Sequence, residues 1–110
     1  MTIETESTWI VVARLSDVQR CPQRVTIGEQ QVGVYWFNGQ VYALDNECPH
    51  ASAPLTDGYL NPDGHIECAL HGWRYHLKTG ASPLAYQGCV RTFSLRIQGE
   101  NVEIFLPNNP

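Results

Sequence analysis

The stretch Cys48-Pro49-His50 is followed, after residues 51–67, by Cys68-Ala69-Leu70-His71. Each of these two segments offers one thiolate and one imidazole. Together they can bind either one zinc ion or a [2Fe–2S] cluster in which two histidines replace two cysteines on one iron. Zinc ligands usually come in Cys–Cys and His–His pairs, each pair from one knuckle or helix. Here each segment mixes the two types, which in a cluster lets the cysteines meet on one iron and the histidines on the other. The spacing therefore favours the cluster and leaves zinc as the alternative.

The two segments resemble the cluster-binding loops Cys-x-His and Cys-x-x-His of the Rieske family. The resemblance covers nearly the whole chain and extends outward to Tyr42-Ala43-Leu44-Asp45-Asn46 and Leu77-Lys78-Thr79-Gly80. It implies one [2Fe–2S] cluster per chain, with Cys48 and Cys68 on a buried iron. His50 and His71 would ligate the outer iron that takes the electron, and their free imidazole edges would reach solvent as its exit.

The resemblance also implies how the surrounding chain supports the ligands. The turn Ala81-Ser82-Pro83-Leu84 is similar to the Pro-containing loop that covers the cluster from a third side. Backbone N–H groups of all three loops would donate to the cluster sulfurs. Ser52 stands where many relatives carry glycine. Respiratory members brace their loops with a disulfide, and its positions are occupied here by Ala53 and Leu70, so the chain resembles the ferredoxin-like branch.

Two aromatic residues after the second loop bear on the reduction potential. High-potential relatives carry a Ser at the position of Trp73 and a Tyr at the position of Tyr75, and both hydroxyls hydrogen-bond toward the cluster. A hydrogen bond to a charged group contributes about 1.5–3 kcal/mol net, and about 1.4 kcal/mol corresponds to about 59 mV for one electron. With only the Tyr75 hydroxyl kept, we expect a potential in the lower half of the Rieske range of about −150 to +300 mV.

The sequence on either side of the two segments predicts an all-β fold. Short apolar or alternating runs predict strands over residues 9–13, 25–27, 32–37, 41–44, 65–68, 90–97 and 102–106. Asn38-Gly39, Gly28-Glu29 and Gly99-Glu100 predict hairpin turns, and Ser16-Asp17 predicts a single helical turn. Residues 46–86 are rich in Pro, Gly, His and Cys. We therefore expect one Rieske domain over residues 1–110, an antiparallel β-sheet base with an inserted loop-rich cluster-binding subdomain at about residues 46–86.

Length and charge narrow the function further. The 110 residues have the size of one ordinary domain. A net charge of −4 argues against binding to nucleic acid, and it suits either ordinary solubility or an acidic carrier that docks onto a basic partner surface. No apolar run approaches the about 20 residues of a membrane span, and the short acidic start lacks the features of a secretory signal. We therefore expect a cytoplasmic protein without a membrane or nucleic-acid partner.

The remaining cysteines and histidines are assigned plain structural roles. Cys21 and Cys89 are expected to be spare thiols that pack among apolar side chains, without a disulfide between them. His65 is expected to be a solvated turn residue, and His76 to lie at the surface or beside the ligands. Trp73 either covers the cluster or contacts a partner protein.

The resemblance implies an electron carrier and not an enzyme that makes or breaks bonds. The first hypothesis is a ferredoxin that takes electrons from a flavoprotein reductase and passes them to a terminal oxygenase. The alternative is a fixed small subunit of a nitrite reductase or similar complex, bound to a reductase catalytic subunit, and a structural zinc module comes third. An oxygenase would need a further site of two histidines and a carboxylate, and beyond His50 and His71 the chain has only His65 and His76.

Overall fold

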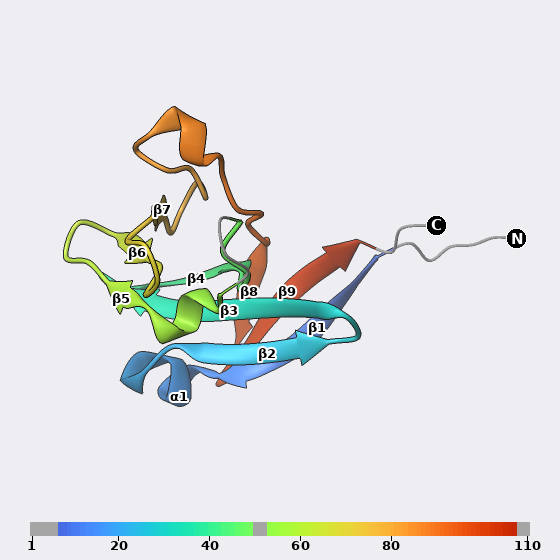
Figure 1. The fold of residues 1–110 in the computed structure, drawn as a ribbon. Helices are drawn as coiled ribbons and strands as arrows, with labels where there is room; N and C mark the ends of the chain where they lie inside the picture. The colour runs from blue at the N-terminus through green and yellow to red at the C-terminus, as the bar shows by residue number, and fades with distance from the viewer. Residues whose placement is uncertain (1–6, 50–52, 108–110) are drawn as a thin grey trace, which may run out of the picture.

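The computed structural model describes residues 7–49 and 53–107, which form three antiparallel sheets of three strands each (Figure 1). The first sheet has the order β1 (Ser7–Arg14), β9 (Asn101–Pro107), β8 (Leu95–Gln98). The second contains β2 (Gln23–Ile27), β3 (Gln30–Phe37) and β4 (Gln40–Asp45), and the third contains β5 (Tyr59–Leu60), β6 (His65–Glu67) and β7 (Arg74–His76). The helical elements are short: α1 (Leu15–Arg20) and the 3₁₀ turns η1 (Leu55–Asp57) and η2 (Ala85–Gln87). The predicted all-β class and antiparallel base are confirmed.

The three expected hairpin turns are present. Asn38 and Gly39 join β3 to β4 with φ values of 54° and 83°, the conformation that two-residue hairpin loops require. Gly28 and Gly99 also have positive φ and begin the turns between β2 and β3 and between β8 and β9. The helical turn is present too, although α1 begins at Leu15 and its N-cap, Arg14, makes no side-chain hydrogen bond.

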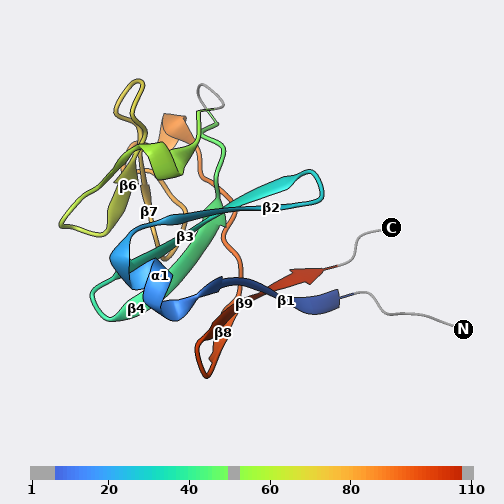
Figure 2. The same cartoon turned by 90° about the horizontal axis from the view of Figure 1, so that it is seen from below.

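Strand β3 is the centre of the molecule because both of its faces are buried. Val32 and Val34 point into a core shared with the β1–β9–β8 sheet, where Val102 and Ile104 are fully buried. Tyr35 points to the opposite side, into a second core that contains Cys48 and Cys68. The β2–β3–β4 sheet is thus the middle layer, with the β1–β9–β8 sheet on one side and the β5–β6–β7 sheet on the other (Figures 1 and 2).

Residues 90–97 differ from the single strand that was predicted. Only Leu95–Gln98 form a strand, while the preceding segment makes isolated backbone contacts, such as the bridge between Thr92 and Leu44. The reason is that this segment runs between two sheets: the N–H of Val90 donates to Gly80, and the N–H of Phe93 donates to Ala43. Residues 91–93 thus pair with β4, whereas Ser94 accepts the N–H of Phe105 in β9, so the segment cannot form one continuous ladder.

The third sheet, η1 and η2 all lie between residues 46 and 87, close to the predicted insert. Strands β5 and β7 were not predicted, because runs of two and three residues are too short to show an alternating pattern. The exact bounds of the insert stay a prediction. Within the part of the chain that the structure describes, no helix is long and apolar enough to cross a membrane.

Candidate metal centre

The two predicted cysteine ligands lie in one buried core. Cys48 comes shortly after β4 and has an exposed fraction of 0%, while Cys68 comes directly after β6 and has 1%. Both pack with the fully buried Leu55, Ile66 and Tyr75. The two loops therefore bring their thiols into the same water-excluded space, although residues 49–67 separate them in the sequence.

The backbone of each loop is held by its own hydrogen bonds. In the first loop the N–H of Cys48 donates to the Ala53 carbonyl oxygen at 2.9 Å, and the N–H of Leu55 donates to that of Asn46 at 2.7 Å. In the second loop the N–H of Cys68 donates to the Trp73 carbonyl oxygen at 2.7 Å. The loop then reverses at a glycine with a φ of 73°, Gly72, a conformation that other residues adopt at a cost.

Of the two predicted histidine ligands, the structure describes only His71. His71 is exposed, so it lies at the surface of the same loop whose Cys68 is buried. His50 lies outside the described residues, as does Ser52. The structure thus brings Cys48, Cys68 and the loop of His71 to one end of the third sheet.

Tyr75 stands beside the thiols as a fully buried hydroxyl. Its O–H lies 3.2 Å from the Gln87 carbonyl oxygen, to which it donates a hydrogen bond. Burial, followed by the charge of Cys48 and a hydrogen bond with Cys48, raises the pKa of Tyr75 to about 12. The hydroxyl that the resemblance to high-potential relatives pointed to therefore lies next to the sulfur of Cys48, a predicted ligand.

The donor set fits a histidine-ligated [2Fe–2S] cluster. Thiolates are the ligands that iron–sulfur clusters use, and the two buried cysteines share a core with the Tyr75 hydroxyl, which lies beside Cys48. The imidazole of His71, by contrast, is at the surface. One thiol-lined inner side and one imidazole-lined outer side are what a cluster with two unlike irons requires.

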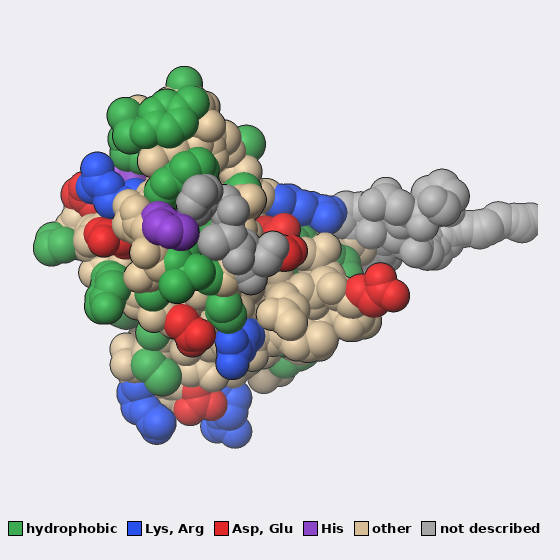
Figure 3. Space-filling model, in the orientation of Figure 1, with side chains coloured by type: hydrophobic (Ala, Val, Ile, Leu, Met, Phe, Trp, Pro, Cys, Tyr) green, Lys and Arg blue, Asp and Glu red, His purple; other side chains and the backbone are tan. Residues whose placement is uncertain are grey.

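Residues 81–84, which were predicted to cover the cluster, project from the molecule together with η2. We call residues 81–87 the projecting segment. The Ser82 hydroxyl donates to Gln87 Oε1 at 2.6 Å and accepts the N–H of Leu84, so this segment folds on itself. Leu84 and Tyr86 are 49% and 76% exposed, and Figure 3 shows hydrophobic side chains covering this projection, which is orange in Figure 1. The half-buried Trp73 packs against the thiol-containing core and meets the Tyr86 ring edge-on at 6.1 Å, which suits the covering role.

Two predictions about the other cysteines are wrong. Cys21 and Cys89 are both exposed, so neither packs in a core. Cys21 follows the last residue of α1, where the chain leaves the surface of the sheet. Cys89 pairs through its backbone with Ala81 at the root of the projecting segment, and its side chain is directed to solvent. Both are free thiols.

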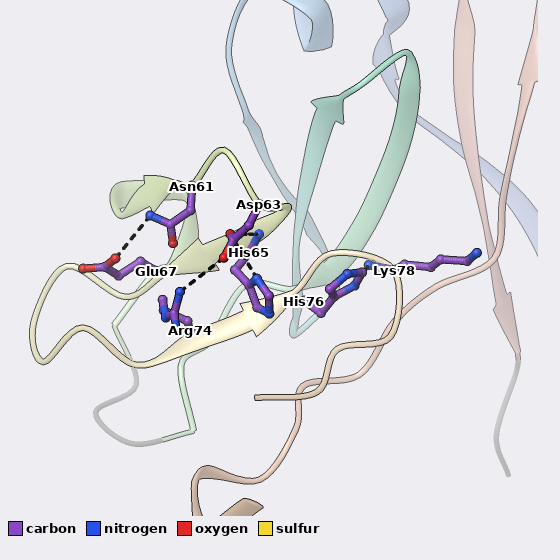
Figure 4. Close-up of polar contacts among 7 residues, drawn as sticks. All are labelled: Asn61, Asp63, His65, Glu67, Arg74, His76 and Lys78. Atoms are coloured by element: carbon purple, nitrogen blue, oxygen red, sulfur yellow. Dashed lines mark hydrogen bonds and ion pairs between the residues drawn. The ribbon is translucent and has the colours of Figure 1, made fainter. Parts of the chain in front are cut away.

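The prediction that His65 is a solvated turn residue is also wrong. His65 lies in β6 with 17% of its side chain exposed, and its Nδ1 is 3.1 Å from Asp63 Oδ1 (Figure 4). Its ring meets that of His76, its partner across the strands, edge-on at 5.0 Å. The hydrogen bond with His65 is the main cause that keeps the pKa of Asp63 below its usual range, and Arg74, 3.4 Å away, adds to it. Arg74 is thus paired with this carboxylate.

The sequence pointed to neither Gln87 nor Asn46 as part of the site. Gln87 meets Tyr75 only because the third sheet and η2 pack together, so no local pattern could reveal it. Asn46 is 1% exposed, and its Oδ1 accepts the N–H of Thr56 at 2.8 Å across the ends of the first loop. A polar residue between a strand and a ligand loop was the available signal for Asn46.

Comparison with known proteins places this geometry in a family. Residues 8–94 match the model of the Rieske [2Fe-2S] domain. The ferredoxin component of the naphthalene 1,2-dioxygenase system of Pseudomonas putida is 34% identical, over 89% of this chain and 95% of that protein. The structure of the Sphingomonas yanoikuyae B1 ferredoxin is similar with a TM-score of 0.82 and 30% identity, over 91% of this chain and 100% of that one.

A further solved structure is a complex of reduced oxygenase and oxidised ferredoxin in carbazole 1,9a-dioxygenase, similar to this chain with a TM-score of 0.76 and 29% identity over 87% of this chain and 91% of that one. Members of the matched family carry a [2Fe–2S] cluster, so the cofactor is the cluster and not a single zinc ion. With its buried thiols, its exposed imidazole and its three-layered sheets, this chain belongs to the Rieske [2Fe–2S] family.

Proposed function

We propose that this protein is a ferredoxin that carries one electron at a time from a flavoprotein reductase to a terminal oxygenase. The observation that carries the proposal is the pair of buried thiols, Cys48 and Cys68, with an exposed imidazole, His71, on the same loop as Cys68. The similar proteins support it, since the Pseudomonas putida relative is the ferredoxin component of a dioxygenase system. The chain is a carrier in such a system and does not itself catalyse bond making.

The ligand set of the proposal is Cys48 and Cys68 on the inner iron and His50 and His71 on the outer iron. When bound, the cluster accepts and releases a single electron. The protein's own contribution is to exclude water from the thiol side, where both cysteines are at most 1% exposed. It also presents the His71 side to solvent, so a partner can approach the outer iron through the imidazole.

The surface near His71 suits brief contacts with a partner. Leu70 on the same loop is 59% exposed, and Leu84 and Tyr86 on the projecting segment are 49% and 76% exposed. A few apolar side chains among polar ones are typical of the small interfaces of electron-transfer encounters. The net charge of −4 adds attraction to a basic partner, which mainly raises the rate of association.

The fixed-subunit alternative predicts a large continuous apolar surface. In the part of the chain that the structure describes, the other large apolar side chains that are exposed are Val11, Tyr59 and Ile97. Val11 and Ile97 belong to the β1–β9–β8 sheet, while Tyr59 belongs to the third sheet, so these side chains are dispersed over two layers. This dispersal favours the diffusing carrier.

We propose the cytoplasm as its compartment, because the exposed Cys21 and Cys89 are free thiols.

The first test is electron paramagnetic resonance on the dithionite-reduced protein, with iron and acid-labile sulfide assayed on the same sample. Two irons and two sulfides per chain, with the low average g value of a histidine-ligated cluster, are expected. His71→Cys is expected to lower the potential sharply or to lose the cluster, while the control His76→Cys keeps the wild-type spectrum. A His71→Cys protein with unchanged spectrum and potential would refute the ligand set.

Electron transfer itself is tested by mixing the reduced protein with an oxidised dioxygenase-system oxygenase and following cluster oxidation. Rapid, saturable oxidation supports the carrier role. A fully loaded protein that no such oxygenase oxidises would favour the fixed subunit.

A further inference from the structure

Three buried polar atoms near the base of the first ligand loop have no hydrogen-bond partner among the described residues. They are the Tyr35 hydroxyl oxygen, Asn46 Nδ2 and Thr56 Oγ1. Tyr35 and Asn46 are 0% and 1% exposed, so bulk solvent does not reach them. The large majority of buried side-chain polar atoms in proteins have a partner, so three such atoms call for a physical explanation.

Gly33 shows that these three side chains meet in one place. A Cβ built on Gly33 would lie 2.7 Å from the Tyr35 hydroxyl oxygen, 2.9 Å from Thr56 Cγ2 and 3.1 Å from Asn46 Oδ1. The three side chains come from β3, from the residue after β4 and from η1, and they converge on a strand position without a side chain. We call the site formed by Gly33, Tyr35, Asn46 and Thr56 the Gly33 niche.

The chemistry of the niche matches one small molecule that both accepts and donates hydrogen bonds. Asn46 Nδ2 can only donate, because the other amide atom, Oδ1, already accepts the N–H of Thr56 at 2.8 Å. Burial raises the pKa of the Tyr35 hydroxyl, so it keeps its proton and is a second donor. The Thr56 hydroxyl can accept. A buried water typically makes two to four such bonds, and globular proteins hold about one buried water per 27 residues.

We propose that the Gly33 niche binds one structural water molecule, which accepts hydrogen bonds from Tyr35 and Asn46 and donates one to Thr56. This water ties the central strand β3 to both ends of the first ligand loop, since the carbonyl oxygen of Asn46 accepts the N–H of Leu55. Asn46 and Thr56 are then positioning residues for Cys48. The water site itself is independent of the carrier role, and only its effect on Cys48 rests on the proposed ligand set.

Whether the water is bound can be tested by the sign of the change in stability when one of its three partners is replaced. Removing a buried polar atom that has no partner leaves a protein equally stable or more stable, whereas removing one partner of a bound water destabilises it. We therefore expect Tyr35→Phe and Thr56→Val each to lower the Tm of the loaded protein by about 4 °C or more. The matched control is Tyr42→Phe, because Tyr42 pairs with Tyr35 across the strands but donates to Gln40 at the surface.

A double variant and a crystal structure complete the test of binding. Tyr35→Phe combined with Thr56→Val is expected to lose about as much Tm as either change alone, because the first change already releases the water. A high-resolution crystal structure is expected to show a water within hydrogen-bonding distance of all three side chains. Single variants that match or exceed the Tm of the control, or a crystal structure with direct contacts among the three side chains, would overturn the water site.

The positioning role has its own readout at a temperature well below the Tm. We expect Thr56→Val to release iron to a chelator several times faster than Tyr42→Phe, and to broaden the signal of the reduced cluster in electron paramagnetic resonance. Iron release and a signal equal to those of the control, in a variant with lowered Tm, would overturn the positioning of Cys48. A loaded protein that transfers no electrons to an oxygenase would refute the proposed function without affecting either result.

Discussion

Replacing Tyr75 by Phe removes a buried hydroxyl that lies beside Cys48 and donates to the Gln87 carbonyl oxygen at 3.2 Å. A donor near a ligand sulfur stabilises the reduced cluster more than the oxidised one, because the reduced cluster carries one more negative charge. The variant is therefore expected to have a lower reduction potential. Its Tm is also expected to fall by about 4 °C, because a buried carbonyl oxygen loses its donor.

The size of the shift in reduction potential depends on how the single proton of the Tyr75 hydroxyl is shared between Cys48 and the Gln87 carbonyl oxygen. A hydrogen bond to a charged group contributes about 1.5–3 kcal/mol, but the Tyr75 hydroxyl also serves Gln87, and only the difference between the two redox states counts. Taking a third to a half of that energy leaves about 0.5–1.5 kcal/mol, which corresponds to a fall of about 20–60 mV for a one-electron couple.

The assay is a redox titration of the loaded protein followed by circular dichroism or by voltammetry. Tyr86→Phe is the matched control, since Tyr86 is 76% exposed and solvent screens its hydroxyl. The control is expected to keep the wild-type potential. An unchanged or raised potential in Tyr75→Phe, or an equal shift in both variants, would show that this hydroxyl does not act on the cluster.

Three further predictions concern backbone, pH and salt. Gly80→Ala is expected to destabilise the protein by about 2 kcal/mol more than Gly88→Ala in chemical denaturation, because both have positive φ but only a Cβ at Gly80 would collide with the Val90 carbonyl oxygen; equal losses would contradict this. The pKa values of Tyr35 and Tyr75 lie above their usual value of 10.0, so their contribution to stability is complete below pH 10 and is lost as the pH rises, for Tyr75 through about 12. Phenolate absorbance should therefore show these two ionising last, and their titration together with the exposed tyrosines would refute it. Oxidation by an oxygenase is expected to slow as salt is added, since a net charge of −4 steers association; a salt-independent rate would argue for apolar docking alone.

The cofactor and most strands could be predicted because their signals are local. Two short segments, each with one cysteine and one histidine, indicated the cluster. Asn38-Gly39 predicted a hairpin that the structure contains, because the turn needs residues that tolerate positive φ and few others do. Alternation along residues 32–37 predicted β3, whose two faces enter two different cores.

Contacts between segments that are distant in the sequence leave no local pattern, and the wrong predictions for His65 and Cys89 concern such contacts. His65 was misjudged because the environment of a histidine depends on its cross-strand partner, and His76 is brought to it by the pairing of β6 with β7. Cys89 was misjudged because the predicted strand breaks where the chain passes between sheets.

The sequence by itself determined which atoms can bind the cluster, since thiolates and imidazoles are properties of residue types and their spacing. Only the tertiary structure decided what surrounds them: the burial of Cys48 and Cys68, the hydroxyl of Tyr75 beside a sulfur, and the polar niche at Gly33. The physical reason is that coordination chemistry is carried by single residues. Burial and hydrogen bonding, in contrast, are relations between segments that meet only when the three sheets pack together.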